Sequence, residues 1–265
     1  MKVYISADME GIAATAVWDE VDRKHKDYPA FSKQMTAEVV AACEGALAGG
    51  ATEVLVKDAH ASGRNITAGE LPKEAKLIRG WSGHPYSMMQ ELDESFDYVL
   101  MIGYHSWAGS GDNPLSHTMT GKAAEITVNG IKASEFLLNT YTAAMHKVPV
   151  VFLSGDEALC KHAEKLISGI HTVGVKKGVG DSVITMQPEK AVEDIRLKVA
   201  EAVPGDSSEC LIDLPEHFDL MIRFNKAKDA YKASFYQDMS LEDEQIVRFK
   251  TADWMEVLKM IQFVL

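Results

Sequence analysis

The sequence predicts an α/β fold with a mainly parallel sheet flanked by helices, followed by a smaller C-terminal α+β portion. In the first two-thirds of the chain, short apolar segments alternate with longer segments whose apolar residues recur at helical spacing. Beyond residue 206, strand-like segments follow one another before a closing amphipathic helix. At 265 residues, the chain suits a single domain, residues 1–265, with a possible C-terminal subdomain at 206–265.

The individual elements follow from local signals. Apolar runs predict strands at residues 2–6, 52–56, 98–102, 148–153, 209–214, 218–224 and 245–250, and periodicity predicts helices at 31–47, 133–146, 156–167, 188–203 and 252–265. Gly49-Gly50 ends the first helix, Asn129-Gly130 marks a hairpin, and Asp156 and Thr251 are expected helix caps. Residues 204–208 form the best linker candidate. Because ligands bind beyond the carboxyl ends of parallel strands, the site is expected at that edge.

Charge and cysteine content exclude several classes of partner. The net charge is −12 and no run of lysine or arginine stands out, which argues against nucleic acid and anionic membrane surfaces. No window approaches the roughly 20 apolar residues of a membrane span. The three cysteines are few, widely separated and without CxxC spacing, and no secretory signal is visible at the start. We therefore expect a cytoplasmic protein that binds neither nucleic acid nor membrane.

Carboxylate and imidazole groups follow three predicted strands at the point where each ends. Asp8 and Glu10 follow the strand at 2–6, His60 follows the strand at 52–56, and His105 follows the strand at 98–102. Two carboxylates two residues apart leave an extended backbone on the same side, and a divalent cation offsets their repulsion. Singly, each group has a plainer interpretation as an acidic turn or an ordinary histidine. Their convergence on one sheet edge favours a metal site.

Residues further along the chain leave alternatives open. The glycine-rich loop at 106–120 contains His117, which could supply acid/base chemistry or simply tie down the loop. Glu135 begins a helix, where a carboxylate commonly complements the helix dipole. Asp58 could orient an imidazole or stabilise a turn. The stretch at 176–182 is interpreted as a surface turn rather than an anion-binding loop.

Five short blocks, in this order, resemble the D-aminopeptidase family of zinc peptidases. They are SADMEG at 6–11, EVLVKDAH at 53–60, GYH at 103–105, SHTM at 116–119 and SEFLLN at 134–139. The resemblance implies two Zn²⁺ ions per chain and His117 as the active-site histidine. It also implies that Asp8 bridges the ions, that Glu10 and His105 hold one, and that His60 and Glu135 hold the other. Carboxylate and imidazole ligands suit Mn²⁺ or Co²⁺ as well as zinc.

The same resemblance implies an activity and an assembly. The expected activity is an aminopeptidase releasing N-terminal D-amino acids such as D-Ala from short peptides, with His117 as acid/base or nucleophile. The expected assembly is a homo-oligomer, a ring-like decamer built from two stacked five-membered rings. Two other functions remain compatible with the residues. One is a two-metal phosphoester hydrolase, and the other is a non-catalytic, metal-stabilised oligomeric binding protein.

Overall fold

The computed structural model describes residues 1–265 and contains a central seven-stranded sheet. Its order is β3 (Ala75–Ile78), β2 (Glu53–Asp58), β1 (Lys2–Ala7), β4 (Tyr98–Tyr104), β7 (Val150–Asp156), β8 (His171–Val179) and β9 (Ser182–Thr185). All neighbouring strands run parallel except β8 and β9. The predicted α/β fold with a mainly parallel sheet is therefore confirmed.

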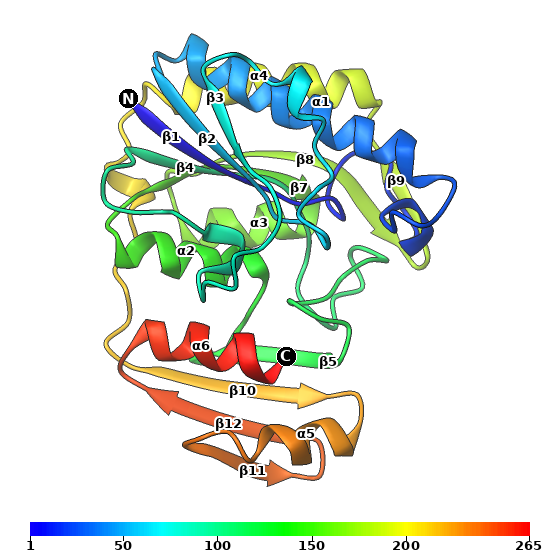
Figure 1. Ribbon diagram of the computed structural model, residues 1–265, viewed down its shortest axis with the longest axis vertical. Helices are drawn as coiled ribbons and strands as arrows, with labels where there is room; N and C mark the ends of the chain where they lie inside the picture. Colours follow the sequence, from blue (N-terminus) through cyan, green and yellow to red (C-terminus); the bar gives the residue numbers. More distant parts are fainter.

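Helices cover both faces of this sheet. In Figure 1, α1 (Tyr28–Ala48) and α4 (Pro188–Ala202) lie above the sheet, and α2 (Glu135–Met145) and α3 (Glu157–Leu166) lie below it. Four short 3-10 helices lie in the connections, namely η1 (Trp18–Glu20), η2 (Ala68–Glu70), η3 (Ser87–Met89) and η4 (Ser208–Cys210). No helix combines the length and the apolar character that crossing a membrane requires.

A second, antiparallel sheet forms the lower part of the molecule in Figure 1. Its order is β11 (Met239–Asp243), β12 (Ile246–Thr251), β10 (Phe218–Phe224), β5 (Ala123–Val128) and β6 (Ile131–Lys132), with α5 (Ala227–Ala233) and α6 (Trp254–Val264) beside it. Because β5 and β6 come from the middle of the chain, residues 206–265 supply only three of its five strands. The division of the chain into domains stays a prediction.

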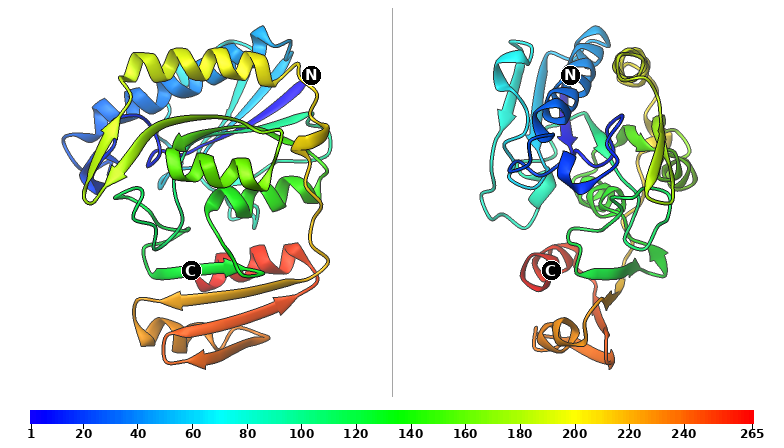
Figure 2. Two further views of the ribbon diagram at one scale, coloured as in Figure 1. Left: turned by 180° about the vertical axis from the view of Figure 1, so that it is seen from behind. Right: turned by 90° about the vertical axis from the view of Figure 1, so that its right-hand side faces the viewer.

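Helix α2 joins the two parts of the molecule, as both views in Figure 2 show. Phe136 and Ala143 belong to the larger apolar core around the first sheet, whereas Leu137, Leu138 and Tyr141 belong to the smaller core against the second sheet. Apolar residues on both sides of a helix are typical of a helix buried all round. This packing determines where the first turn of α2, with Glu135, lies relative to β4.

Most predicted elements are present, with local corrections. Asp156 caps α3 by accepting from the Leu159 N–H, and Gly50 has the left-handed φ of 98° expected after α1. The predicted strand at 209–214 is wrong. This segment carries the chain from the first core to the second, so its alternating apolar residues, such as Ile212, contact cores rather than a strand edge. The cap of α6 is Asp253, not Thr251, because the Asp253 carboxylate accepts from the Met255 N–H.

Five elements carried no clear sequence signal, namely β3, β8, β9, β11 and α5. Strands β9 and β11 are largely exposed edge strands, so burial does not impose a hydrophobic pattern on them. Strand β8 is longer than its apolar run and includes Lys176, which is 2% exposed. The expected surface turn at 176–182 is therefore wrong at its start, and only its end, around Gly180, is a turn between β8 and β9.

Candidate metal centre

Three adjacent strands deliver the first groups of the site. The order β2-β1-β4 places these parallel strands side by side, so their carboxyl ends meet at one edge of the sheet. Asp8 and Glu10 follow β1, His60 follows β2 and His105 follows β4, and each of the four is at most 4% exposed. The convergence predicted from the strand ends is what the fold produces.

Asp8 lies between two histidines. Its Oδ1 is 3.3 Å from His60 Nδ1, and its Oδ2 is 3.5 Å from His105 Nε2. Glu10 Oε2 lies 2.9 Å from His60 Nδ1, and Glu135 Oε2 lies 3.5 Å from His105 Nε2. One carboxylate thus faces two pairs of potential ligands through its two different oxygens, which is the arrangement of a bridging ligand.

The grouping of ligand atoms differs from the one implied by the resemblance. Three sets have all their ligand atoms within 4.8 Å of one another: Asp8, Glu10 and His60; Asp8, His105 and Glu135; and Glu10, His105 and His117. Glu10 lies with His60 in one set and with His105 in another, whereas Glu135 lies with His105 and no set joins it to His60. The assignment of ligands to individual ions stays a prediction.

Glu135 reaches the cluster from the first turn of α2. Ser134 caps the helix by accepting from the Leu137 N–H, and Glu135 Oε1 accepts from the Met119 N–H at 2.7 Å. Met119 has a φ of 62°, a left-handed conformation that is uncommon outside glycine and concentrates at functional sites. The bond therefore ties the loop that carries His117 to the helix that carries Glu135.

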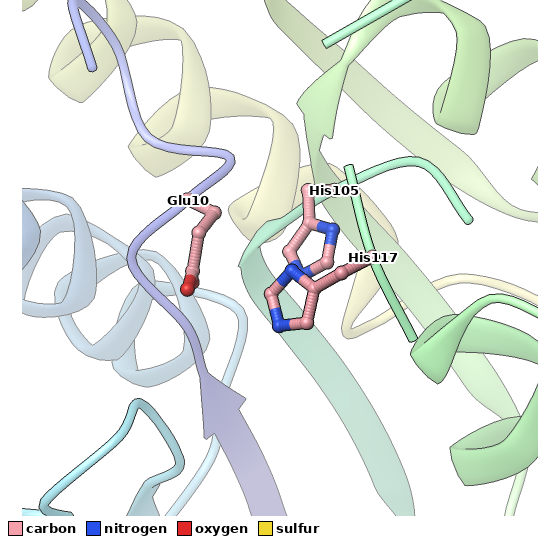
Figure 3. A group of neighbouring side chains, drawn as sticks. All are labelled: Glu10, His105 and His117. Atoms are coloured by element: carbon pink, nitrogen blue, oxygen red, sulfur yellow. The ribbon is translucent and has the colours of Figure 1, made fainter. Parts of the chain in front are cut away.

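His117 lies over His105. The two rings are nearly parallel, with centroids 4.4 Å apart and an angle of 16° between their planes, and Glu10 lies across from them in Figure 3. The Nδ1–H of His117 donates to the Leu115 carbonyl at 2.9 Å, which leaves Nε2 as the nitrogen with a free lone pair. This Nε2 lies 3.7 Å from Glu135 Oε1. His117 also lines the cavity, so it can exchange a proton with a bound molecule.

The charges of the cluster call for a cation. Burial and Glu10 raise the pKa of Asp8 well above its usual range, whereas His60 holds the pKa of Glu10 well below it despite burial. Burial alone would lower the pKa of His105, but the carboxylates of Glu135 and Asp8 raise it to about 10. Without a metal ion, the carboxylates therefore favour the protonated, positively charged form of the imidazoles. Metal ions would replace those protons, because an imidazole must be neutral to bind a metal.

His105 gives the sharpest test of whether these residues fit a metal. Its Nδ1–H donates to the Ser106 carbonyl at 2.9 Å, which directs Nε2 into the cluster. This Nε2 is buried and has no hydrogen-bond partner. Buried polar atoms are rarely left unpaired, and carboxylate oxygens with imidazole nitrogens are donors that zinc accepts. The residues present fit a divalent metal centre.

Residues behind the ligands hold the two ligand loops in place. Lys176 is buried and donates from Nζ to the carbonyls of Glu10 and Thr15, so it secures the loop that follows Asp8. Asp58 accepts from the N–H groups of Asn65 and Ile66, so it stabilises the turn after His60 rather than an imidazole. The sequence left the role of Asp58 open and missed Lys176, whose neighbours Lys177 and Gly178 gave it the look of a surface residue.

A cavity of about 1010 Å³ opens onto the cluster. Its walls include Asp8, Glu10, His60, His117 and Glu135, so five of the six predicted site residues line it. The sixth, His105, lies underneath with a fully buried side chain. Further lining residues that the sequence did not single out are Trp18, Arg23, Lys24, Arg64 and Trp81. Trp18 lies in the short helix η1 and the others lie in loops, and no local signal distinguishes them.

Comparison with known proteins shows the family to which the chain belongs. The family model described as D-aminopeptidase matches residues 1–263. The chain belongs to the D-aminopeptidase family. It is 32% identical over 258 residues to the D-aminopeptidase of Bacillus subtilis (strain 168), covering 97% of this chain and 93% of that protein.

A solved structure is similar over the whole chain. It is the Zn-dependent D-aminopeptidase DppA from Bacillus subtilis, described as a self-compartmentalizing protease, with a TM-score of 0.92 and 30% sequence identity. The match covers 100% of this chain and 96% of DppA. Membership of this family makes the chain a peptide hydrolase, and the resemblance seen in the five sequence blocks is confirmed.

Proposed function

We propose that the chain is a zinc-dependent D-aminopeptidase that holds two zinc ions through Asp8, Glu10, His60, His105 and Glu135. The position of Asp8 carries the proposal, because its two oxygens face His60 and His105 at 3.3 and 3.5 Å. The Zn-dependence of the similar DppA supports zinc as the metal. Mn²⁺ and Co²⁺ accept the same oxygen and nitrogen donors, so they are the expected substitutes.

The metal and His117 would divide the chemistry between them. Bound zinc would act as a Lewis acid that lowers the pKa of water and polarises the scissile carbonyl. His117 would hold or move a proton at Nε2, since its Nδ1–H is committed to the Leu115 carbonyl. Its contact with the His105 ring keeps this nitrogen at the cluster. The leaving amine needs a proton when the peptide bond breaks, and a positioned imidazole is suited to supply it.

The proposed substrates are short peptides with an N-terminal D-residue, of which D-Ala-D-Ala is the simplest example. The carboxylates of the cluster favour the positive N-terminal ammonium of such a peptide. The family name and the Bacillus subtilis relatives support the D-configuration. The cavity of about 1010 Å³ is large enough for peptides of more than two residues.

We also propose a compartment and an assembly. Three unpaired, buried cysteines suit a reducing environment, which supports the cytoplasm. DppA is described as self-compartmentalizing, which supports a homo-oligomer, and we propose the ring-like decamer. Light scattering of the purified protein should then give about ten times the 29.1 kDa mass of one chain. A mass of one or two chains at micromolar concentration would refute the ring.

Metal analysis together with paired peptide assays tests the proposed activity. We expect two zinc ions per chain by mass spectrometry of the metal, and release of D-Ala from D-Ala-D-Ala in preference to L-Ala from L-Ala-L-Ala. His117→Ala should lower kcat by about 10²–10⁴-fold, the usual contribution of a general acid or base. It should retain both zinc ions, because Asp8 and the other four proposed ligands remain.

A matched control and two contrary outcomes complete the test. His217→Ala removes an exposed imidazole from the far part of the chain and should leave both activity and metal content unchanged. Equal turnover of the two stereoisomers would overturn the D-specificity. Hydrolysis of p-nitrophenyl phosphate without hydrolysis of any peptide would replace the proposal with a phosphoester hydrolase. Bound zinc without any hydrolysis would favour a binding protein.

A further inference from the structure

Three basic side chains line the cavity of the metal centre without a carboxylate partner. Arg23, Lys24 and Arg64 all belong to the cavity wall and are exposed. Arg23 Nη1 donates to the Arg64 carbonyl at 3.1 Å and to Ser62 Oγ at 3.5 Å. Lys24 and Arg64 make no hydrogen bond through their side chains, and none of the three forms an ion pair. In a chain of net charge −12, three unpaired cations on one cavity wall require an explanation.

The loops that carry these cations are anchored to the metal centre. The Val21 carbonyl accepts from His60 Nε2 at 3.0 Å, two residues before Arg23. Asn65, which follows Arg64, is 3% exposed and donates from Nδ2 to the His60 carbonyl at 2.7 Å. The same Asn65 accepts from the Tyr28 hydroxyl at 2.8 Å. The backbones of Arg23 and Arg64 are therefore held at a set distance from His60, while their charged ends remain free.

The positive charge of Arg23, Lys24 and Arg64 determines which part of a peptide they can bind. Cations repel the N-terminal ammonium of a substrate, whereas a carboxylate is their natural partner. Asp19 and Asp22 also line the cavity, but Asp19 lies 3.5 Å from His25 Nε2, and neither lies within ion-pair distance of the three cations. A carboxylate on the C-terminal side of the scissile bond is therefore the part of a peptide substrate that these cations would attract.

We propose that Arg23, Lys24 and Arg64 form an anion subsite that binds a carboxylate of the peptide substrate on the C-terminal side of the cleaved bond. This inference rests on the proposed aminopeptidase function and adds a substrate class to it, namely peptides with a negative charge beyond the first residue. The carboxylate has two possible sources, the free C-terminus of a short peptide or the side chain of an acidic residue. Both present the same two oxygens to a guanidinium fork.

Paired substrates separate the two sources of the carboxylate. The first pair comprises D-alanyl peptides of two to five residues with a free C-terminal acid or with a C-terminal amide. The second pair is D-Ala-Glu-amide and D-Ala-Gln-amide, which differ only in the charge of a side chain. An extended peptide advances about 3.3–3.6 Å per residue, so the length with the largest acid-to-amide ratio reports how far the subsite lies from the scissile bond.

Substitutions of the two arginines test the assignment to these residues. For Arg23→Gln and Arg64→Gln, we expect KM for the preferred acid to rise by about tenfold or more, the effect of losing one hydrogen bond to a charged group. The corresponding amide should keep its kcat and its KM. Arg196→Gln on α4 removes the same charge at a position away from the cavity. It should leave kcat and KM unchanged for both the acid and the amide. In the His117→Ala background, which does not turn the peptides over, calorimetry should show tighter binding of the acid than of the amide. Substituting Arg23 or Arg64 there should weaken binding of the acid and leave binding of the amide unchanged.

Each result supports or overturns a distinct claim. Wild-type protein that hydrolyses no peptide refutes the proposed function itself. The wild-type protein could instead hydrolyse D-alanyl peptides with the same kcat and KM for acids and amides at every length, and for the Glu and Gln peptides. That result refutes the anion subsite and leaves the proposed function standing. Equal losses on acid and amide in the arginine variants also refute the subsite, because they would indicate a structural role for these residues.

Discussion

Glu38 on α1 is a buried acid beside the loop that carries the proposed metal ligands. Its Oε1 accepts from the Ala13 N–H and from Gln34 Nε2, both at 2.9 Å, whereas its Oε2 is buried without a partner. Burial raises the pKa of this carboxyl from 4.5 to about 7, although Gln34, Ala13 and Lys176 oppose the shift. No donor offsets the burial of Oε2, which favours the protonated, neutral form of this carboxyl.

The raised pKa of Glu38 makes stability depend on pH with a definite sign. Between pH 4.5 and about 7 the folded state holds a proton that the unfolded state has released, so stability falls as the pH rises and is level above that window. One pKa unit corresponds to about 1.4 kcal/mol. Between pH 5 and pH 8, this single group should therefore lower the free energy of unfolding by about 2.5 kcal/mol.

Urea denaturation of the wild type and Glu38→Gln at pH 5 and pH 8, at constant zinc, measures this contribution. The glutamine keeps an oxygen for the Ala13 N–H but cannot ionise, so its advantage over the wild type should grow by about 2.5 kcal/mol from pH 5 to pH 8. Taking the difference between variants cancels the pH dependence of metal binding that both share. Glu74→Gln, at an exposed carboxylate without a partner, serves as the control. A difference between variants that stays constant with pH would refute the reasoning.

Three further substitutions test contacts beside the site and in the smaller core, each by denaturant unfolding at pH 7. Gly11→Ala would bring a Cβ within 1.8 Å of the Tyr104 carbonyl, so we expect a loss of about 1–3 kcal/mol together with a lower zinc content. Unchanged stability and zinc content would contradict this. Lys176→Met removes the donors to the Glu10 and Thr15 carbonyls and should cost about 1–3 kcal/mol, whereas a gain would show that burying the ammonium costs more than its bonds return. Trp254→Phe keeps an aromatic ring but loses the bond from Nε1 to Thr142 Oγ1, for an expected loss of about 1–2 kcal/mol.

The sequence by itself determined the four inner strands β2, β1, β4 and β7 of the central sheet and the edge at which the site lies. Apolar runs alternating with amphipathic helices require parallel strands, and parallel strands bring their carboxyl ends together. Asp8, Glu10, His60 and His105 each follow such a strand, so their convergence was predictable from local pattern alone. This works because the hydrophobic period reports burial within one element, and because the direction of a strand determines where its last residue lies.

The tertiary structure alone decided what distant segments do to one another. Glu135 had the local pattern of a first-turn carboxylate, and the packing of α2 between two cores places it 3.5 Å from His105. Tertiary packing likewise determines that Lys176, which looked like a surface residue, is buried behind the site. It also places Arg23 and Arg64, which no motif distinguishes, on the cavity wall. Residues 209–214 show the opposite error, in which local pattern predicted a strand that the structure lacks. The alternation of apolar residues there comes from contacts with two separate cores. Such contacts depend on how whole elements pack, and local periodicity carries no information about that packing.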